Sequence, residues 1–391
     1  MHKNEVNLAN DETSPLDTSP NALEPSNAGL VEDNYKDEPP WFKRLFTRFK
    51  AFTESLQKRP KTLLILLSVF LLILLVAYLF YGLLADVFDY RATGDEFYLN
   101  ILRFSLENRY PTIFAIIIVA VCVGYSTVIF QTVTGARILT PGVLGFENVY
   151  MFIQTALVFL MASQFVGVVY VLEGNANYAF SVVLMVIFSL LVFLPLLTRG
   201  SKGVFILLLV GIILSTLFAS LTSYMMLLID PNDFDIIQGR MFASFTNPNL
   251  SVMIGATVAA VLAILFTPST RVLDVLSLGR ENAIGLGINH KIVVLRILVI
   301  VSILVAVSTV LVGPIMFLGL LAANLAYQLI KNFRHKYTIP AAILVAAIFV
   351  ALGQFLIYHI VTMQMQLPVI INLVGGVYFI FLLLRERKKS A

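Results

Sequence analysis

Cysteine, histidine and nucleotide-binding motifs are scarce or missing in this chain, and each gap removes a class of function. Its 391 residues include one cysteine, Cys122, so a single copy can form no disulfide framework and no cysteine-based metal site. The four histidines, His2, His290, His335 and His359, are scattered and show no metal-ligand spacing. No phosphate-cradling Gly-x-x-x-x-Gly-Lys-Ser/Thr motif occurs, so this chain does not hydrolyse ATP by that route.

Apolar residues dominate instead: 59% of the chain is hydrophobic, 13% is charged, and the mean hydropathy is +0.88. A hydrocarbon core of ~30 Å needs ~20 apolar residues per helix, and about ten stretches supply them. We therefore predict an all-α, polytopic integral membrane protein with about ten transmembrane helices. In chain order the predicted spans are Leu63–Leu84, Ile113–Gln131, Val143–Phe165, Ala179–Leu197, Val204–Leu228, Val252–Phe266, Ile292–Val312, Ile315–Ile330, Ile339–Val361 and Leu367–Leu384.

The distribution of positive charge predicts the orientation. Cytoplasmic loops are enriched in Lys and Arg. With the N-terminus inside, the outer loops hold only four of the 27 Lys and Arg residues, namely Arg91, Arg103, Arg109 and Arg240. An even number of spans then places both termini in the cytoplasm.

Charged residues are missing from the middle of every predicted span; Glu147 and Arg296 lie about one helical turn inside the inner boundary. A proton- or sodium-coupled carrier usually needs an intramembrane ion site, so a secondary carrier is a weaker alternative. An enzyme acting within the membrane is weaker still, because no catalytic cluster is visible. The uncharged polar residues in the spans either form interhelical hydrogen bonds or line a water-filled passage. They are Gln131, Gln154, Asn324, Gln328, Gln354, His359 and Asn372.

The terminal segments differ in composition from the spans. Residues 1–40 are rich in Asn, Asp, Glu, Ser and Pro, and we predict a disordered acidic cytoplasmic tail without a cleavable signal peptide. Residues 41–61 combine Lys and Arg with an aromatic stripe, which predicts a basic amphipathic helix at the membrane interface. Simple positive flanking of the first span explains the same charges. The transmembrane domain covers 62–385, and 386–391 form a basic cytoplasmic tail.

Two connections are too long for plain turns. The outer one, residues 85–110, predicts a short helix lying across the outer mouth. The inner one, residues 267–291, predicts one or two short helices with apolar Leu273, Leu276, Leu278 and Ile284 between polar positions.

Several short motifs occur in a fixed order along the spans. They are Arg109-Tyr-Pro111, Gln131, Thr134, Leu139-Thr-Pro141, Leu144-Gly145, Gly211-Ile212, Ser215, Leu276-Ser-Leu-Gly279, Ala283, Leu286-Gly-Ile-Asn289, Gly313 to Leu320, Leu367-Pro-Val369 and Gly375. From Asn108 to Arg385 this series resembles the permease subunit of the ferric-siderophore and cobalamin importers, the FecCD-type family of ATP-binding-cassette transporters. Each motif alone is weak evidence for this family, whereas the whole series in the right order is strong evidence.

The sequence also departs from that family's pattern. Departures occur at Thr112, Gly135-Ala136, Arg280, Ala323-Asn324 and Tyr327. The asparagine variant at Asn324, together with Leu139-Thr-Pro141 and Leu144-Gly-Phe146, resembles the branch associated with catecholate-type siderophores.

The resemblance implies a type II importer permease fold in the bacterial cytoplasmic (inner) membrane, with no cofactor and no ATPase site of its own. It implies as partners two cytoplasmic ATPase subunits, an extracytoplasmic substrate-binding protein and a second permease chain, within membrane lipid; nucleic acid is not expected. The implied substrate is a ferric siderophore, and haem or cobalamin remains the alternative for the same fold.

Three sets of site residues follow from the resemblance. For coupling to the ATPase we expect Leu276, Leu278, Gly279, Arg280, Glu281, Ala283 and Gly287, with an ordinary solvated loop as the alternative. For docking of the binding protein we expect Arg91, Arg103 and Arg240, with Arg109 as a local structural charge and ordinary loop charges as the alternative. For the translocation path and its gate we expect Gln131, Gly211, Ser215, Phe242, Phe245 and Asn324.

Overall fold

Helices and their connections make up all of the chain that the structure describes. The computed structural model describes residues 59–81, 87–88, 91, 96–162, 175–198, 203–230, 244–245, 249–359 and 366–390. No strand occurs among these residues, so the all-α prediction is confirmed for them. The predicted tail 1–40, most of the predicted interfacial helix 41–61, and the site residues Arg240 and Phe242 lie outside the described residues.

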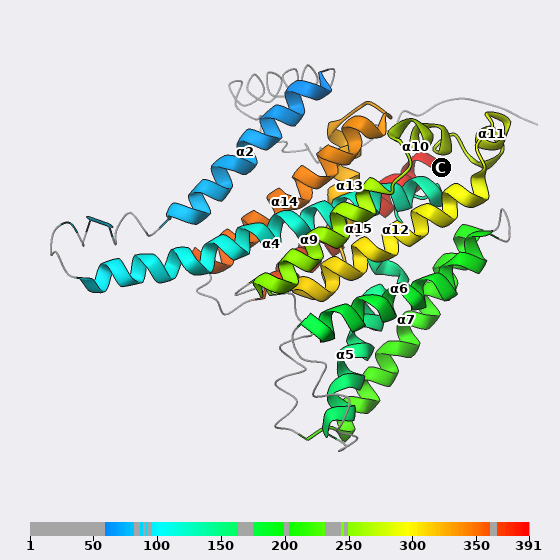
Figure 1. The fold of residues 1–391 in the computed structure, drawn as a ribbon. Helices are drawn as coiled ribbons and strands as arrows, with labels where there is room; N and C mark the ends of the chain where they lie inside the picture. The colour runs from blue at the N-terminus through cyan, green and yellow to red at the C-terminus, as the bar shows by residue number, and fades with distance from the viewer. Residues whose placement is uncertain are drawn as a thin grey trace, which may run out of the picture. The chain divides into compact units, whose positions relative to one another are not determined.

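Ten of the described helices coincide with the ten predicted spans (Figure 1). They are α2 (Pro60–Phe80), α4 (Glu96–Thr134), α5 (Phe146–Ala162), α6 (Asn175–Thr198), α7 (Gly203–Leu228), α9 (Leu250–Leu265), α12 (His290–Val312), α13 (Leu318–Leu329), α14 (His335–His359) and α15 (Leu367–Ser390). The sequence therefore placed these elements correctly to within a few residues, apart from the start of α4 and the end of α15.

Not all ten have the length of a full membrane crossing. Six of them, α2, α4, α6, α7, α12 and α14, are long and apolar enough, and α9 with the following short helix α10 (Thr270–Leu276) forms one further bent pair at 66°. The apolar parts of α5, α13 and α15 are shorter, at 10–17 residues. The number of crossings and the side of each terminus therefore stay predictions.

The outer connection differs from its prediction. We expected a separate short helix across the outer mouth, but residues from Glu96 onward belong to the 39-residue helix α4. Pro111 lies inside this helix without ending it. Proline is tolerated in membrane helices when neighbouring groups satisfy the freed backbone carbonyl.

Helix α12 lies at the centre of the packing, and 13 of its 23 residues are buried. It packs against α4, α6 and α9, while α4 also packs along α14. Gly124 permits this last contact, because a Cβ there would lie 2.9 Å from the Cα atom of Ile343 in α14. Small residues at such crossings let two membrane helices approach closely.

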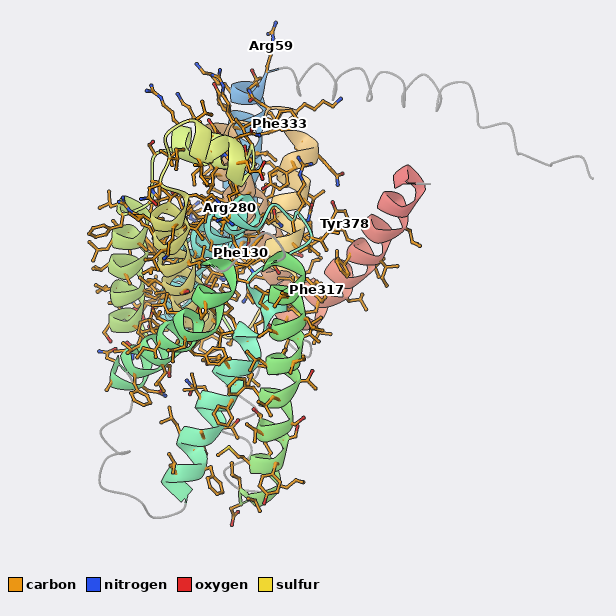
Figure 2. All side chains as sticks on the ribbon, turned by 90° about the vertical axis from the view of Figure 1, so that its right-hand side faces the viewer. Arg59, Phe130, Arg280, Phe317, Phe333 and Tyr378 are labelled. Atoms are coloured by element: carbon orange, nitrogen blue, oxygen red, sulfur yellow. The ribbon has the colours of Figure 1, made fainter. Side chains whose placement is uncertain are left out.

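Helices α2 and α7 are apolar on nearly all sides but mostly exposed. A uniformly apolar, exposed helix is typical of a surface covered by lipid or by another membrane subunit. Figure 2 places Arg59, at the start of α2, and Phe333, just before α14, at the same end of the helices. The positive-inside prediction assigns both to the inner side, so we call this the inner end.

Candidate functional site

Two short helices form the inner connection between α9 and α12. Helices α10 and α11 (Arg280–Gly285) confirm the prediction of one or two short helices in residues 267–291. Gly279 precedes α11 with a φ of 97°, and Gly287 follows it with a φ of 84°. Residues with a Cβ rarely adopt this region, so the backbone itself favours glycine at both positions.

The apolar side chains of this segment point in two directions. Leu273, Leu276 and Ala283 are buried in the hydrophobic core, whereas Leu278 is 57% exposed and Ile284 is 52% exposed. The segment therefore does not present one continuous apolar stripe to a partner. Leu276 and Ala283 pack the segment against the membrane helices, so the exposed residues are the ones available for contact with a partner. Among the predicted coupling residues these are Leu278, Gly279, Arg280, Glu281 and Gly287.

An open pocket of about 450 Å³ adjoins α11 and the start of α12. Its lining includes Arg280, Gly287, His290 and Lys291 and no acidic side chain. Burial, and then the positive charge of Arg280, lowers the pKa of His290 from its usual value. The pocket therefore combines two fixed positive charges with an imidazole whose protonation is disfavoured.

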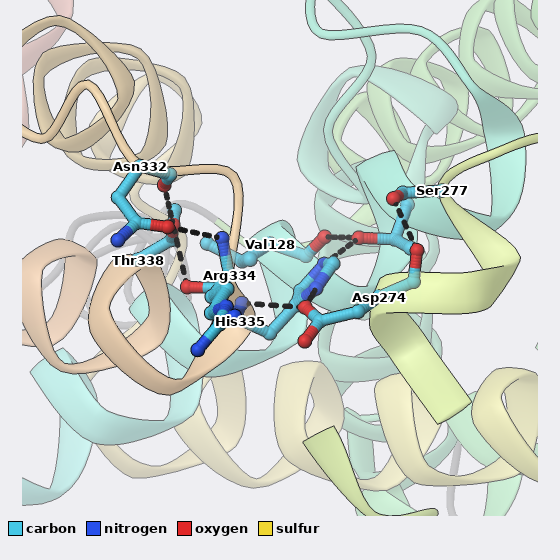
Figure 3. A network of polar contacts seen from close by, with 8 residues as sticks. Val128, Asp274, Ser277, Asn332, Arg334, His335 and Thr338 are labelled. Carbon is cyan, nitrogen blue, oxygen red and sulfur yellow. Dashed lines mark hydrogen bonds and ion pairs between the residues drawn. The ribbon is translucent and has the colours of Figure 1, made fainter. Parts of the chain in front are cut away.

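A polar network ties α10 to α14 and α4 (Figure 3). Asp274 Oδ1 lies 2.7 Å from His335 Nδ1 and also accepts the backbone N–H of His335 at 2.8 Å. The other ring nitrogen of His335, Nε2, lies 2.7 Å from Thr132 Oγ1, and Thr132 donates to the carbonyl of Val128 at 2.8 Å. His335 is 5% exposed, so both of its ring nitrogens find their partners within the protein.

The network continues from α4 into α13. Gln131, the neighbour of Thr132, donates to the carbonyl of Arg137 at 2.7 Å, and Asn324 of α13 donates to the same carbonyl at 3.2 Å. The guanidinium of Arg137 lies 5.1 Å from the centre of the Tyr327 ring, also in α13. These contacts connect α10, α14, α4, the turn after α4 and α13. We call Asp274, His335, Thr132, Gln131, Arg137 and Asn324 the inner polar network.

The predicted pathway residues that the structure describes pack helices together. Gln131, Phe245 and Asn324 are buried within the chain. Gly211 of α7 gives room to Leu144, because a Cβ at Gly211 would lie 2.8 Å from a Leu144 methyl group. The Ser215 hydroxyl accepts a hydrogen bond from Asn148 at 2.5 Å. Their part in translocation stays a prediction. Within one chain, Gly211 and Ser215 join α7 to α5 and the turn before it, Gln131 and Asn324 hold the inner polar network, and Phe245 packs in the core.

The predicted outer arginines that the structure describes differ in burial. Arg109 is 6% exposed, and its guanidinium donates to the carbonyls of Tyr78, Leu79 and Tyr81 at the end of α2. A cation at the C-terminal carbonyls of a helix is stabilising, so Arg109 is a structural charge. Arg91 and Arg103 are exposed, and docking of a binding protein there stays a prediction.

Sequence reasoning missed Asp274, His335 and Thr132 as a unit. Asp274 and His335 are 61 residues apart, and Thr132 and His335 are 203 apart. No local spacing relates such positions. The available signal was a histidine and an aspartate at the inner ends of apolar helices, where an unpaired polar group is costly.

The apolar helices define a polytopic membrane protein. The sequence matches the FecCD transport family over residues 63–385. The chain belongs to that family, and it is a multi-pass protein of the cytoplasmic membrane.

Relatives and a solved structure agree with this membership. The chain is 44% identical to the petrobactin import system permease protein YclO of Bacillus subtilis, over 73% of this chain and 90% of the relative. It is 37% identical to the petrobactin import system permease protein FatC of Bacillus anthracis, over 72% and 79%. The fold resembles an inward-facing metal-chelate type ABC transporter with a TM-score of 0.66 and 22% identity, over 83% of this chain and 99% of that one.

Proposed function

We propose that this chain is the transmembrane permease of an ATP-driven importer and moves a ferric siderophore from an extracytoplasmic binding protein into the cytoplasm. Membership of the FecCD transport family supports the transport class. The names of two relatives at 44% and 37% identity support the substrate class, since both are petrobactin import permeases. Ferric petrobactin is therefore the first substrate to test, and haem and cobalamin are the comparison substrates.

The energy for import is proposed to come from separate ATPase subunits that dock on α11 and its flanks. The observation that carries this proposal is the split surface of the inner segment: Leu276 and Ala283 are buried, while Leu278 and Ile284 are exposed beside a positive pocket. An exposed apolar pair rimmed by charge is suited to entering a groove on a partner. A second permease chain is proposed to cover the exposed face of α7 or α2 and to complete the pathway.

The inner polar network gives the docking movement a route into the membrane helices. A displacement of α10 acts directly on His335 of α14 through two short contacts with Asp274. Through Thr132 and Gln131 it reaches α4 and the turn at Arg137. A few fixed hydrogen bonds between rigid helices are sufficient to bias two alternative packings of a permease.

Copurification and uptake together test the function. The chain is expected to copurify with an ATPase subunit, and vesicles holding the complex with its binding protein are expected to import ferric petrobactin when ATP is supplied. Uptake that persists without ATP and collapses with an ionophore would instead identify a secondary carrier. ATP-driven uptake of haem or cobalamin, but not of ferric petrobactin, would keep the permease class and reassign the substrate.

A further inference from the structure

A small cavity with several polar groups in a mostly apolar wall lies among α4, the turn after it, α5, α12 and the break before α13. Its volume is about 30 Å³. This space holds about two water-sized spheres. One carboxylate and five hydroxyl groups line it: Glu147, Ser126, Thr127, Thr140, Ser308 and Thr309. No cationic side chain is part of this lining, and neither the proposed docking surface nor the inner polar network accounts for it.

Glu147 is the only ionisable side chain that lines this cavity. It lies in the first turn of α5 and is 8% exposed. The N-terminal end of a helix favours an acidic side chain, but a helix dipole offsets only part of the cost of burying a charge. A carboxyl group inside a membrane domain is therefore either protonated or paired with a cation.

Thr140 provides an independent sign of a ligand. Its side chain is 1% exposed, and its Oγ1 atom has no hydrogen-bond partner among the described residues although it lines the cavity. The hydroxyls of Ser126 and Ser308 donate to carbonyls of their own helices, Val123 at 3.3 Å and Val305 at 3.0 Å. Their oxygen lone pairs are left as acceptors, so this wall offers oxygen ligands to a positively charged guest.

Gly142 provides the room beside the carboxylate. A Cβ atom at Gly142 would lie 3.1 Å from Glu147 Oε1 and 3.2 Å from the carbonyl oxygen of Met316. Both oxygens therefore border the same small space, at two interruptions of the helical backbone. Carbonyls freed by such interruptions are used by membrane proteins to coordinate monovalent cations.

We propose that this cavity binds one sodium-sized monovalent cation, coordinated by the Glu147 carboxylate and by the Thr140 hydroxyl, directly or through a water molecule. The ligands are all oxygen atoms, which suit a hard cation. A divalent ion is disfavoured because calcium and magnesium sites generally use several carboxylates, and this cavity has one. A proton alone would neutralise Glu147 but would leave the hydroxyl-lined space and Thr140 without a role.

The test is the thermal unfolding midpoint of the purified full-length protein in sodium chloride and in choline chloride at equal ionic strength. Unmodified protein is expected to unfold several degrees higher in sodium, because a ligand that binds the folded state stabilises it. Glu147→Gln removes the charge with little change of shape. This variant is expected to lose the sodium effect while unfolding in choline no lower than the unmodified protein. Glu107→Gln, an exposed carboxylate of α4, is the matched control and should retain the full effect.

Thr140→Val and Gly142→Ala extend the test to the other ligand and to the room beside it. Both are expected to weaken the sodium effect, measured as a higher half-saturating sodium concentration. A midpoint that is equal in sodium and choline would overturn the proposal. So would a sodium effect that survives in Glu147→Gln, or a midpoint that responds to pH and not to the cation, since the latter would identify a protonated carboxyl group. These outcomes are independent of whether the substrate is a siderophore. The proposed cation stabilises the fold and is not coupled to transport, so sodium-driven uptake without ATP would overturn the proposed ATP-driven import and not the cation site.

Discussion

Helices α10 and α11 are neighbours of similar length, yet the protein holds them in opposite ways. α10 is fixed to the membrane domain, because Leu273 and Leu276 are buried and Asp274 is bonded to α14. α11 buries only Ala283 and leaves Ile284 and Arg280 exposed beside an open pocket. Under the proposed function, this contrast assigns the contact with a partner to α11 and its flanks, and the transmission of movement to α10.

Loss of the exposed apolar contact should have the largest effect. Leu278→Ala is expected to weaken ATPase binding by ~2 kcal/mol, or about 30-fold, because fully burying a leucine side chain at an interface contributes free energy of that size. Folding stability should change by less than ~0.5 kcal/mol, since the side chain is exposed. ATPase affinity for the purified permease measures the effect. Phe333→Ala, at an 82% exposed site outside the segment, is the control, and an equal loss there would contradict a specific role for Leu278.

Loss of the α10 anchor should separate binding from transport. Asp274→Ala is expected to leave ATPase binding near its original value and to reduce uptake per ATP hydrolysed by about tenfold. The reason is that the loss of ~1.4 kcal/mol of coupling free energy between ATPase docking and transport corresponds to that factor. Stability should fall by ~1–3 kcal/mol, since a buried histidine loses its partner. Arg271→Ala, an exposed change on the same helix, should alter neither quantity.

A double-mutant cycle between Asp274 and His335 sharpens this prediction. The two alanine substitutions should be non-additive in uptake per ATP, with a coupling energy of about 0.5–3 kcal/mol. Asp274→Asn keeps an acceptor for the backbone N–H of His335 and should recover part of the loss. Additive effects would show that the network does not act as a unit.

The two glycines flanking α11 should have a smaller, conformational effect. Gly279→Ala and Gly287→Ala are each expected to lower the free energy of unfolding by ~1–2 kcal/mol, because their φ angles of 97° and 84° disfavour a Cβ. A Cβ atom at either position would meet no other atom within 4 Å, so packing adds nothing to this cost. Thermal or denaturant unfolding measures the change. A neutral result at both sites would contradict the backbone argument.

The smallest effect concerns pH at the pocket beside α11. Burial and the charge of Arg280 lower the pKa of His290 in the folded protein, so the unfolded chain binds its proton more readily. Stability should therefore be fully present above the ordinary histidine pKa and decline as the pH falls through that value. Arg280→Ala should reduce this decline, and His290→Gln should remove its contribution, in unfolding midpoints measured between pH 7.5 and 5.5, about one unit either side of the ordinary histidine pKa.

Much of the fold could be predicted from the sequence, because apolar length and the spacing of positive charge report directly on membrane helices. The same patterns predict the end of α12 at Gly313 and the start of α15 near Leu367. They also predict the two short inner helices. The continuous course of α4 through Pro111 was not predicted, since the sequence does not show which neighbours compensate the proline.

The candidate site was only partly predictable. The segment around α11 carries local motifs from which coupling residues could be predicted, whereas the burial of Leu276 depends on helices far away in the chain. The Asp274–His335–Thr132 contacts likewise join three distant segments. Glu147 was visible as an acidic residue inside an apolar run, but its cavity is formed by five separate elements.

The accumulation of ferric petrobactin in sealed vesicles tests the central claim most directly. The permease is reconstituted together with its binding protein, once with and once without its ATPase subunits. Accumulation against the gradient is expected only when the ATPase subunits and ATP are present, and it should be lost when Leu278 is replaced. Accumulation by the permease and binding protein alone would contradict the account.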